Sequence, residues 1–120
     1  MKKILIVDDR FEVVELVKVT LEGEGYQTID ASDGREALEK IGKEKPDLIL
    51  LDIIMPKMDG FEVLRNLKDD SNTKDIPVIM LTAKGQKIDK EEGGRLGAQD
   101  YIIKPFSPSH LLRKIVEILA

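Results

Sequence analysis

The sequence predicts an α/β fold in which a doubly wound, five-stranded parallel sheet carries helices on both faces. Three runs of apolar residues, at 4–7, 48–51 and 78–81, do not alternate with polar residues. Such runs are typical of strands that are covered on both faces in a parallel sheet. Amphipathic stretches of about the length of a parallel crossover lie between the strands. A strand–helix unit repeated five times, (βα)5, therefore predicts an open parallel sheet.

Two weaker strands complete the predicted sheet, at 26–30 and 100–103. Residues 101–103 could equally form a buried helical turn, because a short apolar run does not distinguish the two structures. Their place in the strand–helix order decides in favour of a strand.

The first helix is expected at 10–22, although this stretch is rich in β-branched residues, which form helices poorly. On a helical wheel, the apolar side chains lie on one arc and the charged ones on the opposite side. The residues on the apolar arc are Val13, Val14, Val17 and Leu21. This amphipathic pattern favours a helix over a strand.

Four further helices are expected. Two of them, at 34–44 and 60–69, carry apolar side chains at helical spacing. Glycines weaken the fourth predicted helix, at 86–96. This segment is either the most mobile helix of the domain or a helix end that runs into a glycine-rich turn. Ser107 as N-cap and Pro108 in the first turn indicate the start of the last helix.

The composition excludes several classes of protein. The chain has 120 residues and no cysteine, and its 19 basic and 23 acidic residues give a net charge of −4. This length corresponds to a single domain at 1–120, and the lack of cysteine excludes disulfides and thiolate metal sites. The acidic balance argues against nucleic-acid or membrane binding, and no apolar run approaches the roughly 20 residues of a membrane span. We therefore expect a soluble, cytoplasmic domain.

Polar side chains follow four of the predicted strands, at the point where each strand ends. Asp8 and Asp9 follow the first strand, Asp52 the third, Thr82 the fourth and Lys104 the fifth. The carboxyl ends of parallel strands meet at one edge of the sheet, where ligands of such folds bind. The fold is therefore expected to bring together three carboxylates, a hydroxyl group and an ammonium group that are far apart in the sequence.

The charges of these groups predict a metal ion. Three carboxylates that share one site repel one another, and Lys104 supplies only one positive charge against them. The deficit predicts a hard divalent cation with oxygen ligands, and Mg²⁺ fits such a cluster. A carboxylate beside Mg²⁺ and a lysine is suited to in-line phosphoryl transfer, in which the carboxylate is the nucleophile.

Each of these residues alone has a simpler explanation. Asp8 and Asp9 could cap a helix, and Thr82 could cap a turn. Lys104 could be a solvated charge, and Tyr101 could be a core aromatic residue. Their conjunction at one edge of the sheet is what favours a functional site.

Five stretches of sequence around these residues carry a family resemblance. They are Ile4-Leu5-Ile6-Val7-Asp8-Asp9, Leu51-Asp52-Ile53-Ile54-Met55-Pro56, Met58-Asp59-Gly60, Leu81-Thr82-Ala83-Lys84 and Tyr101-Ile102-Ile103-Lys104-Pro105-Phe106. In this order and spacing, they resemble the response-regulator receiver domains of two-component signalling, the CheY-like superfamily, over nearly the whole chain. The resemblance implies a flavodoxin-like strand order of 2-1-3-4-5, which the periodicity by itself does not predict.

The resemblance also implies a role for each residue of the site. Asp52 would be the phosphoacceptor and would take a phosphoryl group from a phosphohistidine of a sensor kinase or a histidine phosphotransfer protein. Asp9 and Asp52 would ligate Mg²⁺ directly, Asp8 would act through water, and the backbone carbonyl of Ile54 would be a further ligand. Lys104 would bind a phosphoryl oxygen.

A second group of implied roles concerns the response to phosphorylation. Thr82 would move toward the phosphoryl group and Tyr101 would swing inward. These movements would change the face formed by the fourth helix, the fifth strand and the fifth helix. The peptide bond between Lys104 and Pro105 matches the family's cis peptide, a state found in only about 5–6% of such bonds.

A candidate docking surface for the phosphodonor comes from the first helix. Phe11 and Val19 fall on its charged side, where core packing does not require them. They could equally be surface hydrophobic residues without a role. The resemblance adds the loop that contains Pro105 and Phe106 as a second contact.

Two other functions remain as alternatives to a phosphoacceptor switch. One is a pseudo-receiver that only binds proteins, which the complete set of polar residues disfavours. The other is an aspartyl-phosphate phosphohydrolase of the haloacid dehalogenase type, which would carry a second Asp where this chain has Ile54. We therefore expect a domain that catalyses its own phosphorylation and slow dephosphorylation but does not turn over an external substrate. The domain could be a stand-alone regulator, a phosphorelay intermediate or the receiver part of a longer transcription factor. It could be a monomer or a phosphorylation-dependent dimer. The sequence does not indicate its output.

Overall fold

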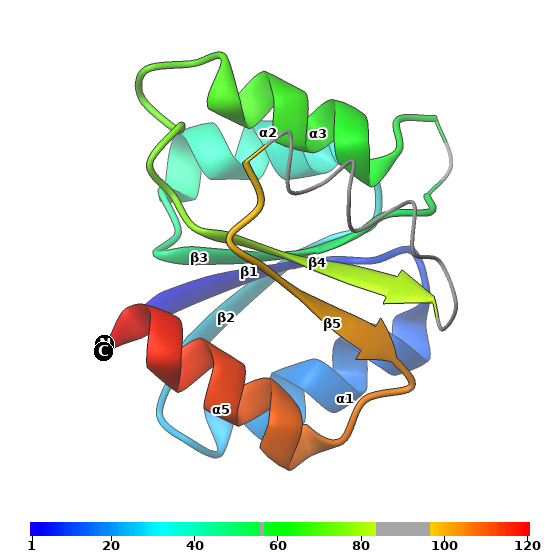
Figure 1. Ribbon diagram of the computed structural model, residues 1–120, viewed down its shortest axis with the longest axis vertical. Helices are drawn as coiled ribbons and strands as arrows, with labels where there is room; N and C mark the ends of the chain where they lie inside the picture. Colours follow the sequence, from blue (N-terminus) through cyan, green and yellow to red (C-terminus); the bar gives the residue numbers. More distant parts are fainter. Residues whose placement is uncertain (56, 84–96) are drawn as a thin grey trace.

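A computed structural model describes residues 1–55, 57–83 and 97–120 of the chain, and these form one layered α/β unit (Figure 1). The predicted five-stranded parallel sheet is confirmed, and its strand order is β2-β1-β3-β4-β5. The strands are β1 (Lys3–Val7), β2 (Gln27–Ala31), β3 (Leu48–Asp52), β4 (Val78–Ala83) and β5 (Asp100–Lys104). The helices of the described ranges are α1 (Phe11–Glu22), α2 (Gly34–Glu44), α3 (Gly60–Lys68) and α5 (Pro108–Leu119). The helix expected at 86–96, and with it the expectation of its mobility, lies outside the described residues.

The sheet separates two apolar cores. Helices α2 and α3 cover one face of the sheet, and α1 and α5 cover the other (Figure 1). Successive residues of β1 point into different cores, since Leu5 packs with α2 and α3 while Ile4 and Ile6 pack with α1 and α5. Burying such a side chain contributes roughly 1.5–3 kcal/mol. This double burial explains why the apolar runs do not alternate with polar residues.

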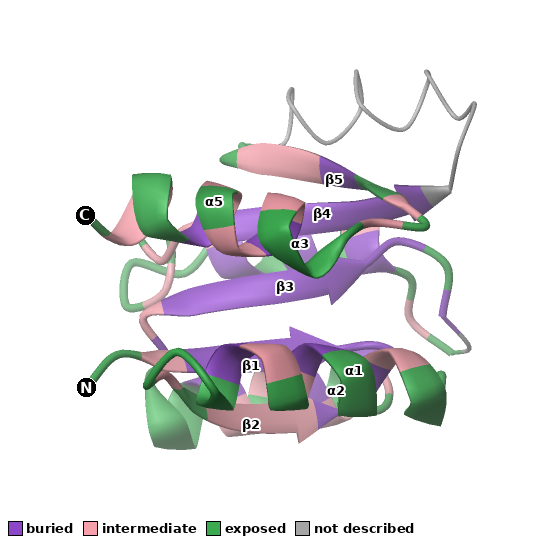
Figure 2. Ribbon diagram, turned by 90° about the horizontal axis from the view of Figure 1, so that it is seen from below, coloured by how far each residue is buried: buried purple, intermediate pink, exposed green. Residues whose placement is uncertain are grey.

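The central strands are the most buried part of the molecule (Figure 2). Every residue of β3 is buried, including the terminal Asp52, whereas only Ala31 is buried in the edge strand β2. The predicted first helix also forms, because Val14, Val17 and Leu21 pack into the core and outweigh the poor helix propensity of β-branched residues.

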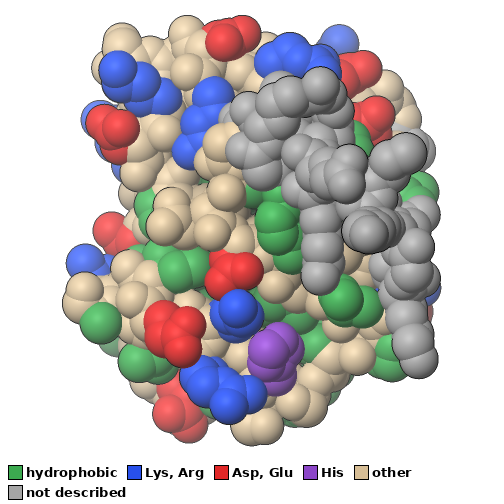
Figure 3. Space-filling model, viewed as in Figure 1, with side chains coloured by type: hydrophobic (Ala, Val, Ile, Leu, Met, Phe, Trp, Pro, Cys, Tyr) green, Lys and Arg blue, Asp and Glu red, His purple; other side chains and the backbone are tan. Residues whose placement is uncertain are grey.

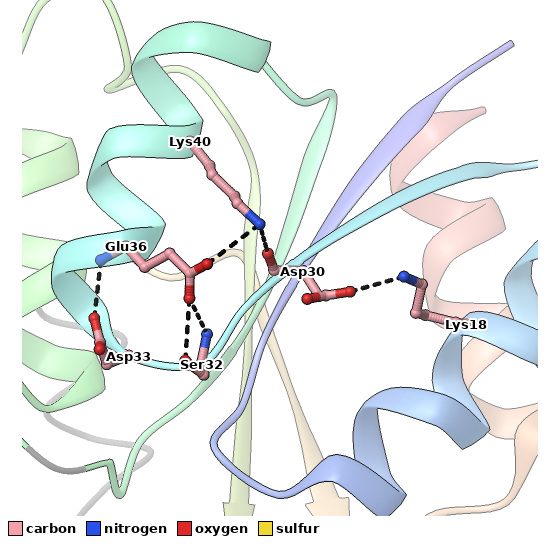
Figure 4. A network of polar contacts seen from close by, with 6 residues as sticks. All are labelled: Lys18, Asp30, Ser32, Asp33, Glu36 and Lys40. Carbon is pink, nitrogen blue, oxygen red and sulfur yellow. Dashed lines mark hydrogen bonds and ion pairs between the residues drawn. The ribbon is translucent and has the colours of Figure 1, made fainter.

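An ion pair and a hydrogen bond anchor the weakly apolar strand β2 to the two neighbouring helices, α1 and α2 (Figure 4). The Lys18 ammonium lies 2.7 Å from the Asp30 carboxylate, and this hydrogen bond raises the pKa of Lys18. On the other side, Lys40 donates to the backbone carbonyl of Asp30 and lies 3.3 Å from Glu36. Glu36 in turn accepts a 2.7 Å hydrogen bond from the backbone of Ser32, which lowers the pKa of its carboxyl group. Because these groups are partly exposed, each pair stabilises the fold only modestly.

The ends of the helices follow the expected capping rules with one exception. Asp33, Asp59 and Ser107 each accept a hydrogen bond from a backbone N–H in the first turn of the helix that follows. The predicted cap at Ser107 is therefore confirmed. At α1, in contrast, the N-cap residue is Arg10, whose side chain makes no capping hydrogen bond.

The surface carries mixed charge. Acidic and basic side chains are interspersed over the face seen in Figure 3. None of the helices in the described ranges is both long and apolar enough to cross a membrane.

Candidate functional site

Side chains from the carboxyl ends of β1, β3 and β5 meet at one edge of the sheet. Asp8, Asp9 and Asp52 each bring a carboxylate oxygen within 4.8 Å of the others. The Lys104 ammonium lies 2.8 Å from Asp8 Oδ2 and 3.2 Å from Asp52 Oδ1. The convergence expected from the positions of these residues in the sequence is therefore present in the structure.

The strand register produces this meeting. Val7 pairs with Leu51, so Asp8 and Asp52 follow equivalent positions on adjacent strands. Lys104 lies on β5, which is separated from β3 by β4. Because adjacent strands are about 4.8 Å apart, a group on β5 must span two strand spacings to reach Asp52. A long side chain such as that of Lys104 can cover this distance.

The carboxylates are unevenly exposed. Asp8 and Asp52 are buried, whereas Asp9 is exposed. Burial raises the pKa of Asp52, and the neighbouring Asp8 carboxylate raises it further, while Lys104 opposes both effects. Two negative charges in a poorly solvated site thus share one ammonium group, and their residual repulsion is what a divalent cation would relieve.

The hydrogen bonds distinguish the two buried acids. Asp8 uses both oxygens, because Oδ1 accepts a 2.9 Å hydrogen bond from the Arg10 backbone and Oδ2 accepts from Lys104. Asp52 contacts Lys104 through Oδ1. Within the described part of the chain, no hydrogen bond or ion pair engages Asp52 Oδ2. One oxygen of Asp52 is therefore available for a metal ion or a reaction.

A hollow of about 330 Å³ opens over Asp52. We call it the acidic hollow, and its lining residues are Asp9, Arg10, Asp52, Ile53, Ile54, Leu81 and Lys104. Its size suits a small anion together with a hydrated cation. The three carboxylates offer the hard oxygen ligands that Mg²⁺ prefers, so the residues present fit this ion.

The start of α3 packs directly on the backbone of Asp52. Gly60 donates a 2.8 Å hydrogen bond to the carbonyl of Ile53, which closes the loop between β3 and α3. A Cβ atom at Gly60 would lie 2.8 Å from Ile53 Cα and closer still to the Asp52 carbonyl oxygen. A side chain at this position would therefore displace the backbone that carries the Asp52 carboxylate.

Thr82 and Tyr101 lie on the strands beside the site. Thr82 is buried on β4, one residue beyond Leu81, which pairs with Asp52. Tyr101 is half-buried on β5 and packs against the core on the α2 and α3 side. Burial and the neighbouring Asp100 raise the pKa of its hydroxyl group.

The structure modifies the expected docking surface. Phe11 and Val19 are 73% and 68% exposed on α1, as the helical wheel predicted. Neither of them lines the second hollow, of about 360 Å³, which lies beside the acidic one. We call it the apolar hollow, and its lining residues are Arg10, Val13, Leu16, Lys104, Pro105 and Phe106. The peptide bond between Lys104 and Pro105 is cis, as the resemblance implied.

Comparison with known protein families identifies the chain. Residues 4–116 match the response regulator receiver domain. The chain belongs to this family. The resemblance drawn from the sequence motifs is therefore confirmed, and this receiver domain can be compared with its relatives.

Curated relatives of the receiver domain are longer regulators. The alkaline phosphatase synthesis transcriptional regulatory protein PhoP of Bacillus subtilis is 49% identical over 118 residues, which are 98% of this chain and 48% of that protein. The phosphate regulon transcriptional regulatory protein PhoB of Pseudomonas aeruginosa is 48% identical, over 98% of this chain and 52% of its own length. The chain thus spans about half the length of these relatives.

Solved structures agree with the fold. A putative response regulator from Chloroflexus aurantiacus has a TM-score of 0.95 and 38% identity, over 98% of this chain and 97% of that one. The chemotaxis protein CheY4 of Vibrio cholerae has a TM-score of 0.93 and 39% identity, over 98% of both chains.

Sequence reasoning assigned no role to several residues around the acids. Ile53 and Leu81 line the acidic hollow, and Gly60 supports its floor. Gly60 belongs to a motif of the family resemblance, but its close approach to Asp52 depends on the path of the loop and not on any local pattern. The sequence did contain a signal for Arg10, because an arginine at the start of a helix is unusual for an N-cap residue.

Our first prediction concerns the charge of Asp52. Because its pKa is raised in the folded state, the ionised carboxylate destabilises the fold, and this effect grows as the pH rises above the ordinary pKa of 3.8. In the absence of divalent cations, Asp52→Asn should raise the melting temperature at pH 7 by a few degrees. The gain should disappear as the pH falls below 3.8, because the Asp52 carboxyl group is then protonated in both the folded and the unfolded protein.

Thermal unfolding followed by circular dichroism between about pH 3 and 8, a range that extends below and above the ordinary pKa of carboxyl groups, checks this prediction. Asp9→Asn is the matched control and should give a smaller gain, because Asp9 is exposed. A gain for Asp52→Asn that does not depend on pH would show that the ionised carboxylate is not its cause.

Our second prediction concerns Gly60. Alanine normally stabilises a helix relative to glycine, but here the added Cβ meets the backbone of Asp52 and Ile53. Gly60→Ala should therefore destabilise the fold by about 1–3 kcal/mol, as overpacking typically does. Gly42→Ala in α2 is the control, because nothing lies within 4 Å of its added Cβ. This variant should unfold at a temperature equal to or above that of the wild type, and the same result for Gly60→Ala would contradict the close approach.

Proposed function

We propose that this receiver domain is a phosphoacceptor switch in which Asp52 accepts a phosphoryl group from a phosphohistidine of a sensor kinase or a histidine phosphotransfer protein. The observation that supports this proposal most directly is the environment of the Asp52 carboxylate. It is buried beside Asp8, one of its oxygens contacts Lys104, and the acidic hollow opens over it. A carboxylate with these neighbours suits nucleophilic attack on phosphorus.

The proposed transfer balances in atoms and charge. An Asp52 oxygen forms a bond to phosphorus while the phosphorus–nitrogen bond of the donor breaks. The electron pair of that bond stays on the imidazole nitrogen, and a proton on the other ring nitrogen makes the leaving histidine neutral. The product is an aspartyl phosphate, and Lys104 would bind one of its oxygens.

The acidic residues would hold Mg²⁺, which neutralises negative charge on the phosphoryl oxygens. Asp9, Asp52 and the backbone carbonyl of Ile54 are the proposed direct ligands. Asp8 would act through water, and the engagement of both its oxygens by Arg10 and Lys104 supports this outer role.

The proposed response passes through Thr82 and Tyr101 to β5 and α5, on the face that the helix expected at 86–96 would complete. The burial of Thr82 beside the acceptor strand and the half-buried position of Tyr101 support this route. We further propose that the receiver controls an output module. Its curated relatives are named transcriptional regulators and are about twice as long, so contact with DNA would belong to that module.

We propose that the donor docks on the apolar hollow, with Phe11 and Val19 beside it. The hollow adjoins the acidic hollow, so a donor bound there would have its phosphorylated histidine close to Asp52. Pro105 and Phe106 would contribute the second side of this surface.

Of the two alternatives, a phosphohydrolase is disfavoured by Ile54, which is 62% exposed where a second acid would be required. A pseudo-receiver is disfavoured by the ion pairs between Lys104 and both buried acids.

Our third prediction tests phosphorylation itself. With acetyl phosphate and Mg²⁺, the wild type should gain the mass of one phosphoryl group, as measured by intact mass spectrometry. Asp52→Asn should gain none, and Lys104→Ala should react at least about tenfold more slowly, because it lacks the cation that contacts the acceptor. Chelation of Mg²⁺ should abolish the gain in the wild type. A phosphorylated Asp52→Asn protein would place the acceptor elsewhere.

Our fourth prediction tests docking. Phe11→Ala and Leu16→Ala should each slow transfer from a phosphorylated histidine phosphotransfer domain by about tenfold, because they remove apolar contacts with the donor. Their rates with acetyl phosphate should not change. Val116→Ala removes another exposed apolar side chain, on α5 and outside the apolar hollow, and serves as the control. Normal transfer to both α1 variants would exclude this surface.

A further inference from the structure

Arg10 occupies a position that local structure does not favour. It is the N-cap residue of α1, with extended backbone angles, φ −100° and ψ 115°, and no capping hydrogen bond from its side chain. Asparagine, aspartate, serine and threonine are preferred at this position because their side chains accept a hydrogen bond from the first turn. A cation here also faces the positive end of the helix dipole. Helix formation therefore does not explain this arginine.

Arg10 lies at the boundary between the two hollows. Among the described residues, only Arg10 and Lys104 line both the acidic and the apolar hollow. A donor that docks on the apolar hollow and transfers its phosphoryl group to Asp52 must bring that group past these two cations.

The two cations differ in their contacts. The Lys104 ammonium is held by Asp8 and Asp52 at 2.8 and 3.2 Å. The Arg10 guanidinium is exposed and takes part in no hydrogen bond or ion pair with another described residue. Arg10 thus places a positive charge beside the acidic hollow that no described residue neutralises through an ion pair.

The charge balance of the site indicates what the Arg10 guanidinium could bind. Asp8, Asp9 and Asp52 carry three negative charges, which Lys104 and one divalent cation would together balance. An incoming phosphoryl group adds about two negative charges at neutral pH. A further cation is then required to attract it, and the planar guanidinium group matches the geometry of phosphoryl oxygens.

We propose that Arg10 is a binding residue that contacts the phosphoryl oxygens of the incoming donor before transfer to Asp52. This inference rests on the proposed phosphoacceptor function. Arg10 would bind the phosphoryl group of the donor before transfer, and Lys104 would bind the aspartyl phosphate after transfer. The recognised chemistry is a phosphoryl dianion, which either an acyl phosphate or a phosphorus–nitrogen compound can supply.

The test uses a substitution that affects folding and donor binding in opposite directions. Asparagine is a good N-cap residue, so Arg10→Asn should raise the melting temperature of the domain. If Arg10 binds the donor, the same variant should need about tenfold more acetyl phosphate for half-maximal phosphorylation, with little change in the maximal rate, as loss of a charged hydrogen bond predicts. Arg10→Lys, which keeps the charge but lacks the planar guanidinium group, should recover only part of the affinity.

Arg35→Asn is the matched control. Arg35 is exposed in the first turn of α2, and it lines neither hollow. Its substitution changes the net charge by the same amount and should leave the half-saturating acetyl phosphate concentration unchanged. An unchanged value for Arg10→Asn, or an equal increase for both variants, would overturn the proposal.

A second donor, phosphoramidate, separates recognition of the phosphoryl group from recognition of the rest of the molecule. Its phosphorus–nitrogen bond matches that of phosphohistidine. For Arg10→Asn, the half-saturating concentration of phosphoramidate should increase as much as that of acetyl phosphate. An increase for acetyl phosphate alone would mean that Arg10 binds the acetyl portion, and the proposal would fail. The same assay tests the phosphoacceptor function separately, because that function requires phosphorylation of the wild type and none of Asp52→Asn.

Discussion

The sharing of one ammonium group by two buried carboxylates is the constraint on which the rest of this domain depends. Asp8 and Asp52 are almost entirely shielded from water, and Lys104 reaches both of them across β4. Removing charges from water is costly, and a single cation does not fully compensate two anions. The raised pKa of Asp52 reflects this imbalance. Hydrophobic side chains would fill the same space more favourably, so the arrangement is explained by chemistry and not by stability.

The fold holds this unfavourable cluster in its most buried part. Strands β1 and β3 carry the two buried acids and lie in the middle of the sheet between both cores. Gly60 adds support from α3, because its backbone N–H donates a hydrogen bond to the carbonyl of Ile53, directly after Asp52. A reactive group must be held in place by packed neighbours if its geometry is to be maintained. The apolar runs of the sequence therefore serve the site as well as the core.

The sequence was sufficient to predict the strands, most helix bounds and the convergence of the polar residues. These depend on local periodicity and on the rule that parallel strands end at one edge. The strand order came from the family resemblance, because pairing between strands leaves no local pattern. The close approach of Gly60 to the backbone of Asp52 and the shape of the apolar hollow were not predicted, since both depend on the paths of loops. For the same reason, the helical wheel identified Phe11 and Val19 as exposed but did not reveal that Leu16 and Val13 line the hollow.

The two edges of the sheet differ in a way that bears on signalling. At one edge, β2 is anchored on both sides, by Lys18 from α1 and by Lys40 from α2. At the other edge, β5 carries Tyr101, which is only half-buried, and Asp100, which forms a 2.8 Å ion pair with Lys114 of α5. Lys104, which contacts Asp52, is the last residue of this strand. In the proposed function, a change of charge at Asp52 would act on β5 through Lys104, whereas the strand that is anchored from both sides lies at the far edge of the sheet. This asymmetry gives a physical reason for the proposed response to pass through β5 and α5.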